Sequence, residues 1–145
     1  MIYTLKNSNN LKKSIIALSL LLGFIVVQTQ AQQTKHHFLL FWRSDCGGCE
    51  VAIKQLVAKC ATLNQDSFII TTISFDTDSV SYFNAIKTNK MEGFENKYNF
   101  SQGYINNPLA KRYGVTKTPT LLYVDAQGKV LATMQEAYIK LSSLK

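Results

Sequence analysis

Residues His36 to Leu63 change their hydrophobic pattern at a pair of cysteines, and this change constrains the fold more than any other feature of the chain. The first part, HHFLLFW, is a short apolar run of the kind found in β-strands that are buried on both faces. After the cysteines, apolar residues recur at helical spacing, namely Cys49, Ile53, Leu56, Val57, Cys60 and Leu63. A buried strand that leads directly into an amphipathic helix predicts a layered α/β domain.

The junction between these two elements is the segment RSDCGGCE, in which two glycines separate Cys46 from Cys49. The transition places Cys46 at the start of the helix, where unpaired amide groups and the helix dipole favour an anion. Because the thiolate is the nucleophilic form of cysteine, this position favours thiol–disulfide exchange. We expect Ser44 or Asp45 to cap the helix, since a side-chain oxygen there can accept hydrogen bonds from the first-turn amides.

Two other uses of the cysteine pair stay open at this point. A zinc site needs a second pair of ligands, and Cys60 with His36 and His37 does not supply one at a suitable spacing. A purely structural disulfide is the other alternative, but a bridge that closes only two residues removes little loop entropy from the unfolded chain. We therefore favour exchange chemistry, and we expect Cys60 to be a buried apolar residue on the same helical stripe as Cys49.

The first 31 of the 145 residues have the layout of a secretory signal peptide. Three lysines and no acidic residue precede a run of thirteen mostly apolar residues, Ile15–Val27. The alternative is an uncleaved membrane anchor, but a helix that spans a bilayer needs roughly 20 apolar residues. Cleavage after Ala31 leaves residues 32–145 as one domain. The loss of three lysines lowers the formal net charge from +7 to +4, and the remaining lysines are scattered, so we expect no nucleic-acid partner.

The remaining sequence predicts further strands and helices around one sheet. β-branched and aromatic residues predict a strand at 67–76. Residues 118–134 predict a hairpin, in which a tight turn at 125–128 joins two strands. Helical patterns predict helices at 77–91, 107–114 and 136–145, and a loop with a short strand lies between the first two. The expected inward positions of the first helix are Val80, Phe83, Ala85 and Ile86. The last helix has Ala137, Ile139, Leu141 and Leu144 as its apolar positions. The fold is therefore an α/β domain with a mixed sheet.

The segment TKTPT, residues 116–120, is the second candidate part of a site. A proline cannot donate to the hydrogen-bond ladder of a sheet, so it normally occupies the first residue of a strand. A cis bond between Thr118 and Pro119 would turn the chain sharply and expose backbone groups beside the cysteines. A trans bond would only start the strand, and the sequence alone leaves both alternatives open.

The segments FLLFWRSDCGGC and NPLAKRYGVTKTPTLLYVDAQGKV together resemble the thioredoxin superfamily, and the resemblance extends from about His37 to the end of the chain. The additional β-α region between the cysteines and Pro119 is similar to the exported thiol–disulfide oxidoreductase branch (TlpA/ResA-like). This resemblance implies a thioredoxin-like fold with a central mixed β-sheet flanked by helices. It also implies a β-α insertion between the CxxC helix and the cis-proline strand.

The resemblance further implies the roles of individual residues. Cys46 is expected to be the nucleophile and Cys49 the resolving thiol of a redox-active disulfide, while Trp42, Thr118 and Pro119 are expected to bind substrate. It implies that protein disulfides are the substrates and that a membrane electron-transfer protein returns the pair to its reduced form. We expect a periplasmic monomer with no small-molecule cofactor and no metal.

The sequence also departs from the thioredoxin pattern. Leu40 occupies the position of a buried acid, so no proton acceptor for Cys49 is evident. Asp45 replaces the usual aromatic residue, and its charge opposes a thiolate at Cys46. The direction of electron transfer stays open between a reductase and an oxidase or isomerase. A non-catalytic or a copper-handling protein of the same fold is a further alternative.

Overall fold

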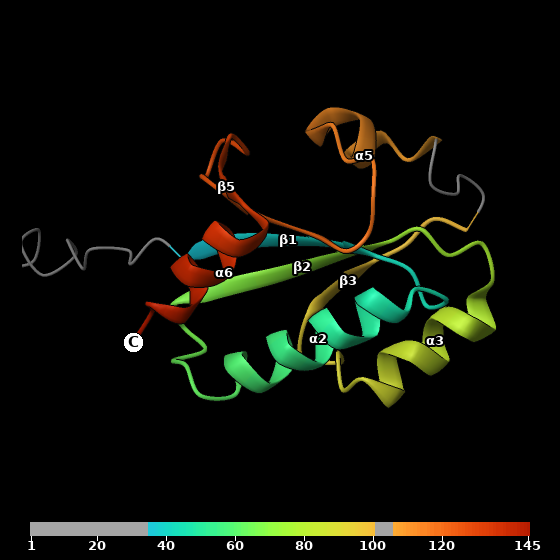
Figure 1. Cartoon of the computed structure of the whole chain (residues 1–145), viewed down its shortest axis with the longest axis horizontal. Helices are drawn as coiled ribbons and strands as arrows, with labels where there is room; N and C mark the ends of the chain where they lie inside the picture. The colour runs from blue at the N-terminus through green and yellow to red at the C-terminus, as the bar shows by residue number, and fades with distance from the viewer. Residues whose placement is uncertain (1–34, 101–105) are drawn as a thin grey trace, which may run out of the picture. The chain divides into compact units, whose positions relative to one another are not determined.

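The computed structural model describes residues 35–100 and 106–145, and the predicted signal peptide with its cleavage site lies outside them. The elements follow one another along the chain (Figure 1): β1 (His36–Trp42), α2 (Gly47–Cys60), β2 (Phe68–Ser74), α3 (Ser79–Thr88), β3 (Glu95–Lys97), α5 (Pro108–Tyr113), β4 (Thr120–Val124), β5 (Val130–Thr133) and α6 (Met134–Ser142). The order of strands and helices predicted from the sequence is confirmed.

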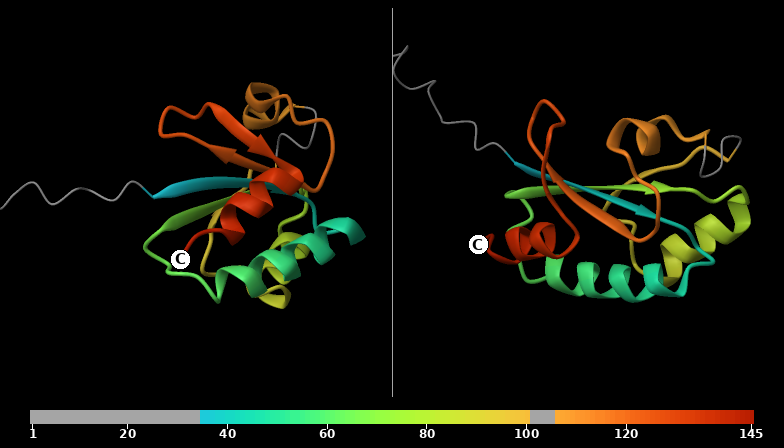
Figure 2. Two further views of the ribbon diagram at one scale, coloured as in Figure 1. Left: turned by 60° about the vertical axis from the view of Figure 1, so that its left-hand side comes forward. Right: turned by 45° about the horizontal axis from the view of Figure 1, so that its top comes forward.

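The strands form one mixed sheet in the order β3-β2-β1-β4-β5. β1 pairs with β2 in parallel and with β4 in antiparallel orientation, and β5 is antiparallel to β4. Figure 2 shows α2, α3 and α6 along one face of the sheet and α5 over the other. β3 lies between α3 and α5 in the chain, and it supplies an edge of the sheet by pairing in parallel with β2.

The continuous apolar character of β1 results from its central place in the sheet. Phe38, Leu40 and Trp42 belong to the core cluster under α2 and α6, whereas Phe41 belongs to the cluster on the α5 face. Because successive side chains of a strand point to opposite faces, a strand covered on both sides needs apolar residues at every position. β1 ends at Trp42, and the polar residues 43–45 then lead the chain out of the sheet to Cys46.

The inward face of α3 differs from the prediction. Val80 and Phe83 are 65% and 53% exposed, whereas Tyr82 is only 1% exposed and packs against Trp42 with ring centroids 5.9 Å apart. Ile86 is buried and Ala85 packs against the same cluster, as expected. The sequence allows both helical phases, and the large ring of Tyr82 fills the space beside Trp42.

The last two helices largely match their predicted ends. α5 begins with Pro108 and ends at Tyr113, and its C-cap is Gly114, whose φ of 62° lies in the left-handed region that favours glycine. α6 begins at Met134, two residues before the expected Glu136. Among its apolar positions, Ala137 and Leu141 are buried and Leu144 packs against the core, whereas Ile139 is exposed.

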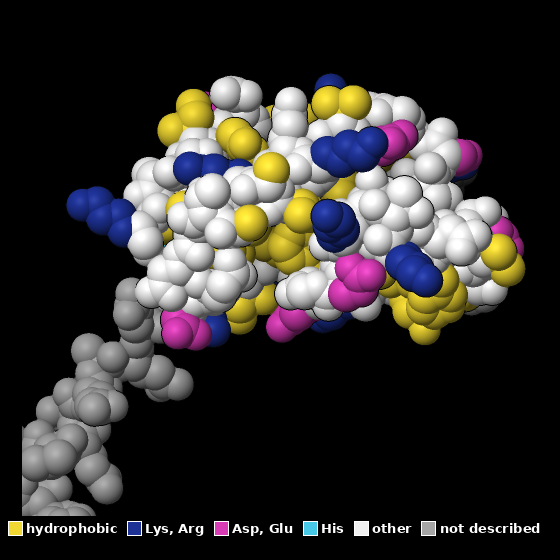
Figure 3. Space-filling view, turned by 90° about the horizontal axis from the view of Figure 1, so that it is seen from below, with side chains coloured by type: hydrophobic (Ala, Val, Ile, Leu, Met, Phe, Trp, Pro, Cys, Tyr) yellow, Lys and Arg dark blue, Asp and Glu magenta, His cyan; other side chains and the backbone are white. Residues whose placement is uncertain are grey.

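One face of the molecule carries charged side chains of both signs. On the face shown in Figure 3, basic and acidic side chains are interspersed around the apolar groups. This distribution agrees with a solvated surface rather than with a continuous basic groove. Within the described residues, we find no helix that combines the length and the apolar character needed to cross a membrane.

Candidate active site

Cys46 itself is the N-cap of α2, so the prediction that Ser44 or Asp45 caps the helix is wrong. The Cys46 Sγ accepts a hydrogen bond from the backbone N–H of Cys49 at 3.1 Å. The backbone carbonyl oxygen of Cys46 accepts from the N–H groups of Cys49 and Glu50. Ser44 and Asp45 are unavailable because Ser44 donates to Asp76 and Asp45 pairs with Arg43. The sulfur therefore lies where the unpaired amides of the helix stabilise negative charge.

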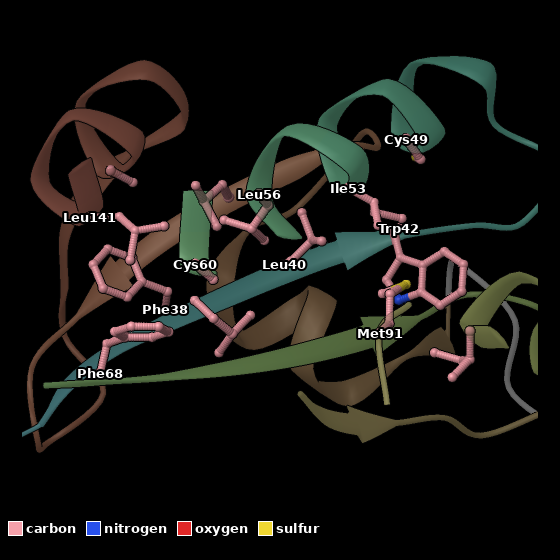
Figure 4. Packing of buried hydrophobic residues seen from close by; sticks show 14 of the residues in the cluster. Phe38, Leu40, Trp42, Cys49, Ile53, Leu56, Cys60, Phe68, Met91 and Leu141 are labelled. Carbon is pink, nitrogen blue, oxygen red and sulfur yellow. The ribbon is translucent and has the colours of Figure 1, made fainter. Parts of the chain in front are cut away.

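The two cysteines are joined in a disulfide, with their Cα atoms 5.1 Å apart, and they differ sharply in accessibility. Cys49 is 0% exposed and belongs to the core cluster under α2, where Figure 4 shows it above the buried side chains of β1. Cys46 is only half-buried. An incoming thiol or disulfide can therefore approach Cys46, whereas Cys49 is reached from Cys46 alone.

The fold brings the Thr118–Pro119 segment against Cys46, although 72 positions separate Thr118 from Cys46. The Thr118–Pro119 peptide bond is cis. The Cys46 Sγ lies 3.8 Å from the carbonyl oxygen of Thr118 and 3.7 Å from its hydroxyl oxygen Oγ1. A Cβ built on Gly48 would lie 3.6 Å from Cδ of Pro119, so the glycine pair also faces this segment. A hydroxyl at this distance can donate to a thiolate and favour its formation.

An apolar groove of about 210 Å³ continues from Pro119 between α2 and α6. Its lining includes Leu40, Leu56, Leu121, Met134 and Tyr138. The Sδ of Met134, at the start of α6, lies 3.4 Å from the backbone N of Leu121. The groove offers an apolar surface that reaches Pro119, the residue after the Thr118 that contacts the Cys46 sulfur.

Trp42 lies under the active-site segment rather than at its surface. Its side chain is fully buried, and Figure 4 shows it among the core residues together with Met91. The indole Nε1 has no hydrogen-bond partner within the described part of the chain. Trp42 therefore supports the segment between β1 and α2, and in this oxidised form it presents no exposed surface to a substrate.

The two local departures from the thioredoxin pattern have structural consequences. Asp45 forms an ion pair with Arg43, which offsets the charge that opposes a thiolate at Cys46. Leu40 is buried in the core, so no carboxylate stands at this position below Cys49. Glu50 is exposed and pairs with Lys54 one helical turn further on, as expected for a solvated acid.

Sequence reasoning missed Asp76, which follows the end of β2. The carboxylate is 6% exposed and accepts hydrogen bonds from the backbone and the hydroxyl of Ser44 and from the hydroxyl of Ser74. Polar residues at 74 and 76, after an apolar run, are the signal that could have revealed it. Because a buried carboxylate requires such partners, Asp76 ties the end of β2 to the segment before Cys46.

The other candidate residues lie apart from this site. Cys60 is a free, buried thiol, and burial raises its pKa to about 12. His36 lies at the opposite end of β1, where its Nδ1 is 2.8 Å from the Tyr123 hydroxyl; burial and the charge of Lys140 lower its pKa. Within residues 35–100 and 106–145, no three His, Cys, Asp or Glu side chains gather as a metal site would require.

Comparisons with known proteins agree with this geometry. The thioredoxin-like domain family matches residues 26–144. No curated protein matches the chain by sequence. Among solved structures, the C-terminal domain of a Bacteroides thetaiotaomicron protein named as a thiol–disulfide oxidoreductase is 25% identical, with a TM-score of 0.63 and 77% of each chain covered.

Two further structures share the fold at lower identity. A thiol–disulfide oxidoreductase from Bacteroides fragilis is 23% identical, with a TM-score of 0.59, and the match covers 78% of this chain and 83% of that one. A secreted disulfide oxidoreductase from Mycobacterium tuberculosis is 18% identical, with a TM-score of 0.58, and the match covers 79% and 85%. The chain belongs to the thioredoxin-like domain family, and it carries the Cys46–Cys49 CxxC pair of a thiol–disulfide oxidoreductase within that domain.

Proposed function

We propose that the protein is an exported thiol–disulfide oxidoreductase that reduces protein disulfides through Cys46 and Cys49. The observation that carries this proposal is the difference between the two sulfurs. Cys46 is accessible, caps α2 and lies beside Thr118, whereas Cys49 is fully buried directly behind it. This arrangement suits a pair in which one thiol attacks and the other resolves.

The reaction begins from the reduced pair. The Cys46 thiolate attacks one sulfur of a substrate disulfide, the substrate S–S bond breaks, and the departing substrate sulfur takes up a proton. The Cys49 thiol then loses its proton and attacks Cys46 Sγ, which breaks the mixed disulfide and releases the second substrate sulfur as a thiol. Two electrons and two protons thus pass to the substrate, and the Cys46–Cys49 disulfide remains.

The Thr118–Pro119 segment and the adjoining groove are the proposed substrate-binding surface. An extended substrate backbone beside Thr118 would place its disulfide near Cys46, and backbone hydrogen bonds along such an edge are tolerant of sequence. An apolar side chain next to the substrate cysteine would fit the groove lined by Leu121 and Met134. Trp42 contributes by holding the segment before Cys46 in place.

We further propose that export involves cleavage after Ala31, so that the mature domain is 32–145 and works in the periplasm. The charged and apolar pattern of residues 1–31 supports this proposal, as does the secreted M. tuberculosis protein of the same fold. A membrane electron-transfer protein is the proposed source of electrons, and the domain acts as a monomer without a cofactor. Mass spectrometry of the protein recovered from the periplasm tests the cleavage site. Cleavage after Ala31 should leave Gln32 as the N-terminal residue.

Insulin-disulfide reduction with dithiothreitol as electron source tests the activity. Cys46→Ala should abolish the enzymatic rate, because no accessible attacking sulfur remains, while the matched control Cys60→Ala should retain it. An unchanged rate in Cys46→Ala would contradict the proposal. Equilibration with glutathione then decides the direction: a potential near about −270 mV indicates a reductase, whereas one near about −120 mV indicates an oxidase.

A further inference from the structure

Asp76 is a buried carboxylate whose hydrogen-bond partners are neutral. Its Oδ1 accepts from the backbone N–H of Ser44 at 2.9 Å and from the Ser44 hydroxyl at 2.8 Å, and its Oδ2 accepts from the Ser74 hydroxyl at 2.7 Å. None of the ion pairs within the described residues includes Asp76. Burial of an unpaired carboxylate is costly, so these three donors must offset the loss of hydration.

The position of Asp76 explains what these hydrogen bonds hold. Ser44 lies two residues before Cys46, in the segment that crosses from β1 to α2. The neighbouring hydrogen bond from the Phe75 N–H to the Trp42 carbonyl anchors the start of the same segment, at 3.0 Å. The path of the chain into Cys46 is therefore fixed at Trp42 and again at Ser44, both times by residues that follow β2.

We infer that Asp76 is a positioning residue that holds the segment before Cys46, so that the Cys46 sulfur stays at the N-cap of α2 in the reduced enzyme. This inference rests on the proposed function only in taking Cys46 as the attacking thiol. While the disulfide is closed, the bond to Cys49 also restrains Cys46. After reduction that restraint is lost, and the Asp76–Ser44 hydrogen bonds become the remaining anchor immediately before the sulfur.

Two effects of Asp76 on the Cys46 thiolate have opposite signs, which makes the inference testable. As an anchor, Asp76 keeps the sulfur near the Cys49 N–H and the helix dipole, and this lowers the pKa of Cys46. As a nearby negative charge, Asp76 disfavours a second anion, and this raises the pKa of Cys46. If positioning dominates, removal of the carboxylate raises the pKa; if charge dominates, removal lowers it.

The experiment measures the pH profile of Cys46 alkylation by iodoacetamide in the purified, reduced protein, with the modified peptide identified by mass spectrometry. Asp76→Ala removes both the anchor and the charge, and we expect a rise in the pKa of Cys46 that slows alkylation at pH 7 by about three- to tenfold. Ser44→Ala keeps the charge and the backbone hydrogen bond, and it should slow alkylation by a smaller factor. Asp76→Asn keeps an acceptor for Ser44 and should restore a rate at or above that of the wild type.

Asp78→Ala is the matched control. Asp78 is also acidic and close in sequence, but its carboxylate caps α3 by accepting from the Ser81 N–H at 2.8 Å instead of holding Ser44. This variant should leave the Cys46 profile unchanged. If Asp76→Ala does not fold, which thermal unfolding reveals, Ser44→Ala with Asp76→Asn carries the test.

The outcomes separate the inference from the proposed function. A faster alkylation in Asp76→Ala, or equal rates in Asp76→Ala, Ser44→Ala and the wild type, overturns the positioning role. A slower rate in Asp76→Asn that matches Asp76→Ala also overturns it, because the retained acceptor should rescue an anchor. The two proposals can also fail separately. If the alkylation profiles of the variants are as expected but the protein reduces no insulin disulfide, the positioning role of Asp76 is supported and the proposed reductase function is contradicted.

Discussion

The two ends of α2 carry the same residue type on the same apolar stripe, yet they have different chemistry. Figure 4 shows Cys49 near one end of the helix and Cys60 at the other, both among the buried side chains. At the N-terminal end, Cys49 is bonded to the half-buried Cys46, whose sulfur accepts a helix amide. At the C-terminal end, Cys60 has no such partner, and burial raises its pKa to about 12.

We therefore expect location, rather than residue type, to decide which cysteine is reactive in this fold. The helix N-terminus stabilises an anion, whereas the C-terminus presents carbonyl oxygens that oppose one. Desolvation adds to the contrast, because a buried thiol without a compensating charge keeps its proton.

The largest expected effect is on alkylation of the reduced, native protein. At pH 8 a thiol with a pKa of about 12 has a thiolate fraction of roughly 10⁻⁴, so Cys60 should react at least about a thousandfold more slowly than Cys46. Peptide mass spectrometry after timed exposure to iodoacetamide measures both rates. In urea, Cys60 should become reactive. Comparable native rates at the two residues would break the comparison.

The second effect is on stability at alkaline pH. The pKa of Cys60 rises from about 9 to about 12 on folding, so between these values the folded state keeps a proton that the unfolded state loses. The free energy of unfolding should therefore fall as pH rises, relative to Cys60→Ala, by about 2 kcal/mol between roughly pH 8.5 and 10.5. Urea titrations of both proteins with the disulfide closed measure the difference. A constant difference across this range would show that Cys60 is not shielded.

The smallest effect concerns helix propensity at the two ends. A Cβ on Gly47 would meet nothing within 4 Å, so Gly47→Ala should raise the free energy of unfolding by about 0.5 kcal/mol. The exposed Ala58 is its counterpart near Cys60, and Ala58→Gly should lower the free energy by up to about 1 kcal/mol. Thermal unfolding measures both. Destabilisation by Gly47→Ala would mean that the first turn requires glycine for a reason other than space.

The helix faces illustrate how far a sequence pattern extends. The buried stripe on α2 agrees with the prediction at Cys49, Ile53, Leu56 and Cys60, because most of the large apolar residues of this helix share one face and the lysines lie outside it. In α3, large aromatic side chains stand at the neighbouring positions 82 and 83, and Tyr82 rather than Val80 and Phe83 is turned inward. A helical period fixes which residues share a face, but the space available beside Trp42 decides which face is buried.

The N-cap of α2 was missed for a related reason. Ser44 and Asp45 are good capping residues by type, but each is committed to a partner, and the partner of Ser44 lies 32 positions away at Asp76. Local preference could not anticipate the competition for Ser44, because it arises only when β1 and β2 pair side by side. The partner of Asp45 is local, since Arg43 lies two positions before it. The same pairing of β1 with β2 makes Asp76 part of the site.

The sequence by itself determined the α/β order of elements, the buried central strand and the place of the cysteine pair between that strand and a helix. These features follow from hydrophobic period and from turn residues, which act over a few neighbouring positions. Only the tertiary structure decided that Thr118 lies against the Cys46 sulfur, that Cys49 is shielded while Cys46 is not, and that Asp76 holds the intervening segment. Each of these depends on contacts between residues distant in the chain, where packing and burial rather than local pattern set the outcome.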